Sequence, residues 1–158
     1  AIAAQAITLA RVCLEDSIKY AIKRKTFGKP LIKHQVIRHK LAEMAWRVES
    51  SWAFLEQITY QLDTMDHKTA TIHCSGSIAL IKAQAALVLA FCAKEAQQIF
   101  GGLAYTRGGQ GAKIERINRE VAAFAIPGGS TEIMFDLSTK IAEKKATGIQ
   151  RMLKKAML

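Results

Sequence analysis

Three loops at predicted helix ends carry the residues whose types and spacing suit binding chemistry. They span residues 24–35, residues 98–111, which are rich in glycine, and residues 126–133. The exposed backbone N–H groups of a glycine-rich loop at a helix end can bind phosphate. The guanidinium of Arg24 can bind a phosphate in a bidentate manner, and Phe27 can pack on a ring. The loops are therefore candidates for a phosphate-bearing ligand.

Glycine pairs also have a structural explanation. Residues 101–102 and 108–109 are each Gly-Gly, a pattern that is typical of a helix terminator and a turn. The dinucleotide-binding pattern G-x-G-x-x-G does not occur, and no predicted strand precedes the glycine-rich loop. A Rossmann site is therefore disfavoured.

Helices must position these loops, because apolar residues recur every three to four positions along most of the chain. The predicted helices span residues 3–25, 34–62, 68–100, 112–125 and 130 to about 142 or beyond, and the last segment, residues 148–158, is short and amphipathic. No stretch alternates apolar and polar residues, so no strand is predicted. Three long helices and a fourth predict an all-α fold, an antiparallel four-helix bundle in a single domain. Because the first and third connections of such a bundle meet at one end, the first loop and the glycine-rich loop are expected to be neighbours.

The net charge of +10 favours anionic ligands and raises nucleic acid as a partner. The basic residues are spread along the chain, however, and aromatic residues make up only 7% without a stacking motif. Charge alone therefore does not identify the anion.

Cysteine and histidine usage predicts neither disulfides nor a metal site. The three cysteines form no CxxC pair, which favours buried thiols in a reducing compartment inside the cell, mitochondrial or cytoplasmic. The four histidines show no metal-ligand spacing. No apolar run approaches the roughly 20 residues of a membrane span. The chain starts inside a predicted helix without Met, as a fragment of a longer protein would.

Four motifs resemble those of the acyl-CoA dehydrogenases. Residues 24–35 (RKTFGKPLIKHQ) resemble R-x-x-F-G-x-P-L followed by Gln, and residues 98–102 (QIFGG) resemble Q-hydrophobic-hydrophobic-G-G. Residues 114–120 (IERINRE) resemble V-E-R/K-x-x-R-D, and residues 126–133 (IPGGSTEI) resemble I-Y-E-G-T-S-E/Q-I. The motifs follow the family's order at similar spacing. The chain is thus similar to the family's C-terminal helical domain, without its N-terminal helical and middle β domains.

The resemblance implies an FAD site that two subunits share. Residues of the first two loops would reach the FAD of a neighbouring subunit, with Arg24 on the pyrophosphate, whereas the third loop would bind the subunit's own FAD. The implied cofactor-binding residues are Arg24, Phe27, Leu31, Gln98, Gly101, Gly102, Ser130 and Glu132.

Two departures from the family pattern stand out. The loop between Gly102 and Ile114 is about three residues longer than in the common family form, and Gly128 occupies the position of the usual catalytic Glu. Glycine supplies no base, so no catalytic residue is predicted in this chain, and Gly128 is expected to tolerate alanine without loss of turnover. The resemblance then points to an isovaleryl-type, long-chain-type or cytochrome-b5-linked-type branch. In the first two, the Glu lies on the helix that begins this chain, just before Ala1.

The implied parent reaction is the FAD-dependent α,β-dehydrogenation of an acyl-CoA thioester, with electrons passing to an electron-transfer flavoprotein or another acceptor. This chain would clamp the cofactor and form a dimer or a dimer of dimers, and alone it would be inactive. The alternative is a non-catalytic helical binding or assembly domain associated with nucleic acid.

Overall fold

The computed structural model describes the backbone of residues 1–156 and the side chains of residues 1–148. Its long helices are α1 (Ile2–Lys23), α2 (Gln35–Thr64), α3 (His67–Phe100), α4 (Ala112–Ala125) and α5 (Thr131–Ala156). Short 3-10 turns η1 (Leu31–Lys33), η2 (Gly101–Ala104) and η3 (Gly109–Gly111) lie in the connections. The predicted all-α fold is confirmed.

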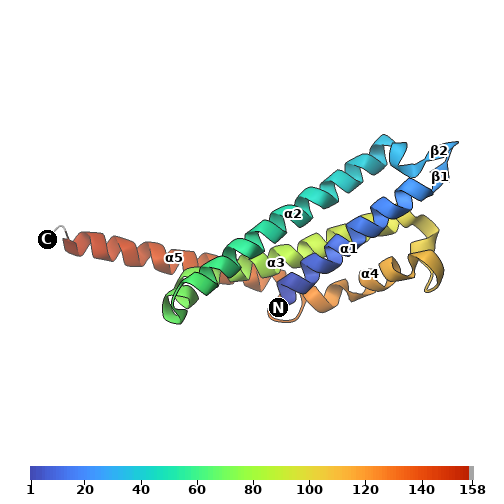
Figure 1. Cartoon of the computed structure of the whole chain (residues 1–158). Helices are drawn as coiled ribbons and strands as arrows, with labels where there is room; N and C mark the ends of the chain where they lie inside the picture. Colours follow the sequence, from blue (N-terminus) through green and yellow to red (C-terminus); the bar gives the residue numbers. More distant parts are fainter. Residues whose placement is uncertain (157–158) are drawn as a thin grey trace.

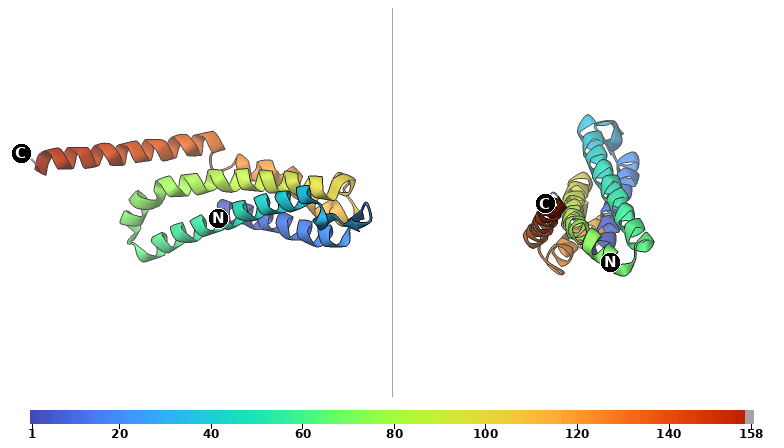
Figure 2. Two further views of the ribbon diagram at one scale, coloured as in Figure 1. Left: turned by 90° about the horizontal axis from the view of Figure 1, so that it is seen from above. Right: turned by 90° about the vertical axis from the view of Figure 1, so that its left-hand side faces the viewer.

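Helices α1 to α4 alternate in direction and form the antiparallel bundle, with α3 at its centre (Figure 1). The fourth position of the bundle belongs to α4, whereas α5 packs along α3 and projects beyond the turn between α2 and α3 (Figure 2). The sequence predicts the helix after Ser130 at that position, and this prediction is wrong. The sequence also predicts residues 148–158 as a short segment of their own, but α5 continues through Gly148 to Ala156. Residues 157–158 of that predicted segment lie outside the described residues.

The core explains why α3 is apolar nearly all round: the other four long helices all pack on it. By length and composition this helix could also cross a membrane, but 56% of its most apolar window is buried inside the bundle, as in a core helix. All three cysteines are buried and free, and burial raises the pKa of the Cys13 and Cys92 thiols to about 12. The largest fully buried side chains include Ile7, Met44, Val48, Leu89 and Ile114.

A small hairpin interrupts the helices, so the prediction of no strands was wrong at one place. Strand β1 (Lys25–Thr26) pairs antiparallel with β2 (Lys29–Pro30). The two residues between them, Phe27 and Gly28, both have positive φ, of 48° and 76°. Two left-handed residues make the tight turn that matches the twist of a hairpin. A pairing of two residues per strand is too short to show an alternating pattern in the sequence.

Candidate functional site

A cavity of about 460 Å³ lies at the hairpin end of the bundle, where the first loop meets the glycine-rich loop. The rings of Tyr20 and Phe100 stack at its base, with centroids 4.3 Å apart. The proximity predicted from the bundle topology is confirmed, because both loops line this one cavity. Its lining residues are Tyr20, Arg24, Thr26, Leu31, Ile99, Phe100, Gly101, Gly102 and Leu103.

Arg24 stands where α1 ends and the hairpin begins. Its backbone is extended (φ −70°, ψ 130°), which ends the helix two residues earlier than the sequence predicted, and its carbonyl accepts the N–H of Leu31 at 2.7 Å. Its side chain is exposed and takes part in none of the ion pairs among the described residues. The guanidinium is therefore available to an anion at the mouth of the cavity.

Phe27 lies at the tip of the hairpin and does not line the cavity. It is 96% exposed and lies edge-on to the ring of His34, with centroids 6.1 Å apart. The His34 ring is held by Thr26, whose Oγ1 lies 3.1 Å from Nε2. An exposed aromatic ring on a left-handed non-glycine residue is unusual, and it leaves the ring free to contact a ligand or another chain.

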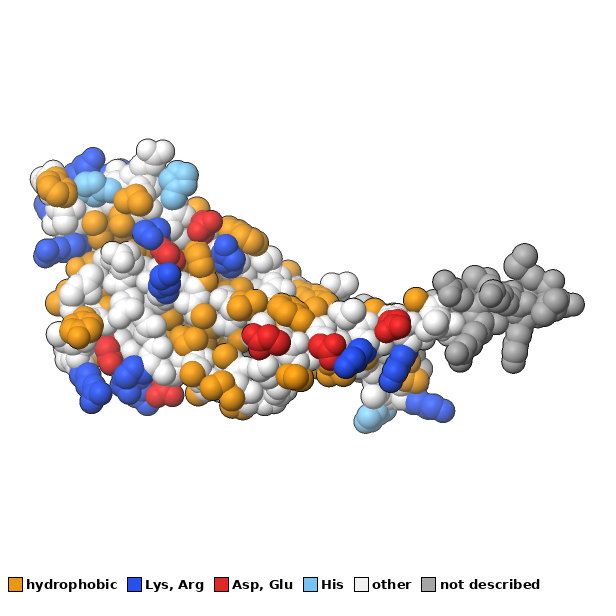
Figure 3. All heavy atoms as spheres, turned by 180° about the vertical axis from the view of Figure 1, so that it is seen from behind, with side chains coloured by type: hydrophobic (Ala, Val, Ile, Leu, Met, Phe, Trp, Pro, Cys, Tyr) orange, Lys and Arg blue, Asp and Glu red, His pale blue; other side chains and the backbone are white. Residues whose placement is uncertain are grey.

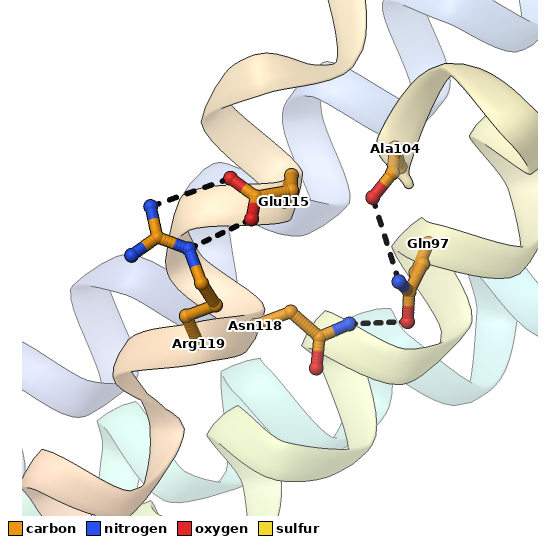
Figure 4. Close-up of polar contacts among 5 residues, drawn as sticks. All are labelled: Gln97, Ala104, Glu115, Asn118 and Arg119. Carbon is orange, nitrogen blue, oxygen red and sulfur yellow. Dashed lines mark hydrogen bonds and ion pairs between the residues drawn. The ribbon is translucent and has the colours of Figure 1, made fainter. Parts of the chain in front are cut away.

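The glycine-rich loop is held in place by a polar network that sequence reasoning missed (Figure 4). Gln97 of α3 donates to the Ala104 carbonyl at 3.4 Å and accepts from the Asn118 amide of α4 at 2.5 Å. On the same helix, Arg119 donates to Glu115 at 2.7 Å. Gln98, the predicted cofactor residue, is exposed on the last turn of α3 and is not among the lining residues. The partner of Gln97, the half-buried Asn118, could not be read from two adjacent glutamines.

The third loop lies elsewhere on the molecule. Ser130 caps α5, since its Oγ accepts the Ile133 N–H at 3.5 Å. Glu132 is exposed in the first turn of α5, where hydrogen bonds with its own backbone N–H and with Ser130 lower its carboxyl pKa. The buried ammonium of Lys82, on α3, donates to the carbonyls of Ala125 and Gly129 beneath this loop.

The predicted site residues thus fall into two groups. Helix α1 separates them, because the third loop lies near its N-terminus and the hairpin at its C-terminus (Figure 1). Its 22 residues span about 33 Å at 1.5 Å per residue. Within one chain, the structure does not bring Ser130 and Glu132 together with Arg24.

Replacing Gly128 by alanine should destabilise the chain, although no loss of turnover is expected from the missing proton-transfer group. Gly128 has φ +71°, and an added Cβ would lie 3.2 Å from Cδ1 of Ile2. The left-handed backbone alone should cost about 1–2 kcal/mol with a side chain present. Thermal unfolding by circular dichroism measures the loss. Gly109→Ala is the matched control. Gly109 has φ +70° and so the same backbone cost, but the space around an added Cβ is open, so the difference between the two variants reports the contact with Ile2. A Gly128→Ala chain that melts like the wild type would refute this prediction.

Comparisons with known proteins agree with the motifs. Residues 1–142 match the family model of the acyl-CoA dehydrogenase C-terminal domain. The chain is 44% identical over 146 residues to the acyl-CoA dehydrogenase AFT10-1 of Alternaria alternata, covering 91% of this chain and 34% of that protein. It is 40% identical over 149 residues to the acyl-CoA dehydrogenase apdG of Emericella nidulans, covering 94% and 34%.

Solved structures show the same fold. A probable acyl-CoA dehydrogenase from Mycobacterium abscessus superposes with a TM-score of 0.78 at 34% identity, over 88% of this chain and 35% of that one. Butyryl-CoA dehydrogenase from Megasphaera elsdenii gives a TM-score of 0.76 at 28% identity, over 88% and 34%. The chain therefore spans about a third of the length of these relatives. The match favours a dehydrogenase domain over the alternative of a nucleic-acid-associated module. This chain belongs to the acyl-CoA dehydrogenase family and corresponds to its C-terminal helical domain.

Proposed function

We propose that this chain is the FAD-clamping and oligomerisation domain of a full-length acyl-CoA dehydrogenase that catalyses α,β-dehydrogenation of acyl-CoA thioesters. The observation that carries the proposal is the cavity at the hairpin end, where Arg24 and the glycine pair meet across two loops.

The donor set of this cavity fits the pyrophosphate of FAD. Arg24 brings a guanidinium without an intrachain ion pair, and an added Cβ at Gly101 or Gly102 would meet no atom within 4 Å, so backbone can approach a ligand closely. Leu31, Tyr20 and Phe100 provide apolar surface beside these polar groups. Phe27 and Gln98, exposed next to the cavity, would contact the ligand from the rim.

The two groups of site residues support two different cofactor molecules per chain. Arg24, Gln98 and the glycine pair would hold the FAD of a neighbouring subunit, whereas Ser130 and Glu132 would hold the subunit's own. A distance of about 33 Å along α1 makes one shared molecule a poor explanation. This arrangement requires a dimer or a dimer of dimers.

Exposed apolar side chains offer surface for such assembly. Trp46, Leu80, Leu87 and Phe135, from α2, α3 and α5, surround a groove of about 380 Å³. Figure 3 shows apolar side chains spread over the face opposite to that of Figure 1. Exposed apolar surface of this kind is typical of a contact between subunits.

When bound, FAD supplies the group that accepts a hydride from the substrate β-carbon. This chain would position the cofactor, and Gly128 provides no group that could remove the α-proton. An added Cβ at Gly128 would lie 3.2 Å from Cδ1 of Ile2, so the start of α1 lies next to this position, which supports a base on the helix of α1 instead. Electrons would then pass to an electron-transfer flavoprotein or another acceptor.

Flavin content and anaerobic bleaching test this function. The full-length protein should purify yellow, and its visible flavin absorbance should fall when an acyl-CoA is added without oxygen. The chain of residues 1–158 alone should be colourless and inactive, because it holds only part of the cofactor's surroundings. A full-length protein without flavin, or a flavin that no acyl-CoA chain length bleaches, would contradict the proposal.

A further inference from the structure

Lys82 is a charged residue in the middle of the most apolar helix, and the cofactor site described above does not use it. It lies on α3 and is only 8% exposed. It belongs to none of the ion pairs among the described residues. A buried ammonium without a carboxylate is costly unless its N–H groups are hydrogen-bonded. The acceptors of its hydrogen bonds therefore indicate the structural role of this lysine.

Both acceptors of Lys82 are backbone carbonyls that frame the third loop. Ala125, the last residue of α4, accepts at 2.8 Å, and Gly129, just before α5, accepts the second hydrogen bond. The Ala125 carbonyl is one of the terminal carbonyls that a helix leaves without an internal partner. A cation at this end also interacts favourably with the helix dipole. Lys82 therefore ties the end of α4 to the beginning of α5.

The loop between these two acceptors needs such a restraint. Gly128 and Gly129 have φ of +71° and +106°, and glycine has the largest backbone freedom of all residues. The next residue, Ser130, caps α5, and Glu132 follows in its first turn. The orientation of both side chains depends on how the two glycines are held.

We propose that Lys82 is a positioning residue for the cofactor-facing loop, residues 126–132. Its ammonium holds the carbonyl of Ala125, just before the loop, and that of Gly129, within it, so that Ser130 and Glu132 are presented to FAD in one orientation. This inference rests on the proposed function, and the lysine acts through the loop without contacting the reacting atoms.

The first experiment tests the loop on this chain without cofactor. Hydrogen exchange is measured for Lys82→Gln, Lys82→Arg and the core control Leu89→Ala, whose parent side chain is fully buried on the same helix. We expect Lys82→Gln to speed exchange about tenfold over residues 126–134 and little elsewhere. Arginine, which keeps a cation donating to carbonyls, should restore most of the protection. Leu89→Ala should instead speed exchange broadly. Uniform or unchanged exchange in Lys82→Gln would overturn the proposal.

A measurement on the wild-type chain covers the case in which Lys82→Gln does not fold. The ¹⁵N signal of the Lys82 ammonium should show slowly exchanging protons coupled to the carbonyls of Ala125 and Gly129. A freely exchanging ammonium without these couplings would overturn the proposal.

The second experiment measures FAD retention in the full-length protein, with Arg24→Ala as the reference. Lys82→Gln should weaken retention about tenfold, more than Leu89→Ala, and Lys82→Arg should recover it in part. If Arg24→Ala loses FAD while Lys82→Gln retains it fully, the positioning role is wrong and the proposed function stands. If neither variant loses FAD, the proposed function fails, and so does this inference, even where the exchange result shows that Lys82 restrains the loop.

Discussion

Gly111→Ala should be the most destabilising single change in the glycine-rich loop, by about 3 kcal/mol or more. A Cβ at this position would lie 2.2 Å from the carbonyl oxygen of Leu103 and 2.7 Å from the backbone N of Ala104. Backbone atoms cannot rotate away as a side chain can, so the loop must open. The melting temperature should fall by about 6–12 °C for a chain of this size.

The matched control for this change lies three residues earlier. Gly108 is extended (φ −132°) and has no atom within 4 Å of an added Cβ, so Gly108→Ala should melt within about 1 °C of the wild type. Equal melting temperatures for the two variants would show that Gly111 does not lie as close to the Leu103 backbone as described. The loop would then need another explanation for its shape.

Arg24→Ala should weaken FAD retention in the full-length protein about tenfold or more. A guanidinium on a pyrophosphate makes charge-assisted hydrogen bonds, which contribute about 1.5–3 kcal/mol each, and about 1.4 kcal/mol corresponds to a factor of ten. Lys at this position should rescue only in part, because an ammonium lacks the planar fork. Equilibrium dialysis of the flavin, or its fluorescence on release, gives the dissociation constant.

Arg38→Ala is the control for charge, because Arg38 is also exposed but uses its guanidinium on the carbonyl of Lys33 at 2.8 Å. It should keep the wild-type affinity for FAD. If Arg24→Ala retains full FAD, or if both arginine variants lose it equally, the assignment of Arg24 as the pyrophosphate clamp is wrong.

Topology made part of the site predictable. In an antiparallel bundle the first and third connections share one end, and this predicts Arg24 beside Gly101 and Gly102, as the cavity shows. The N-terminal cap of α5 at Ser130 was predictable for a similar reason, since a cap depends on residues adjacent in sequence. The roles of these residues toward FAD rest on the family resemblance and remain predictions.

Contacts between distant residues were not predictable. Lys82 binds a carbonyl 43 residues away, and in the sequence it only interrupts an apolar run. The neighbouring glutamines 97 and 98 have the same side chain, yet the first is tied to Asn118 and the second is exposed. The cost of alanine at Gly128 for stability is not readable from the sequence, because neither its positive φ nor the nearness of Ile2 has a local signal.

The sequence by itself determined the helices, their order, the all-α fold and the family, because periodicity, caps and motifs are local properties of the chain. Only the tertiary structure decided that α4 rather than α5 completes the bundle, that Phe27 and Gly28 turn a hairpin, and that the site residues divide between the two ends of α1. These features depend on which surfaces bury each other. Burial is settled by the packing of the whole chain and not by any one segment.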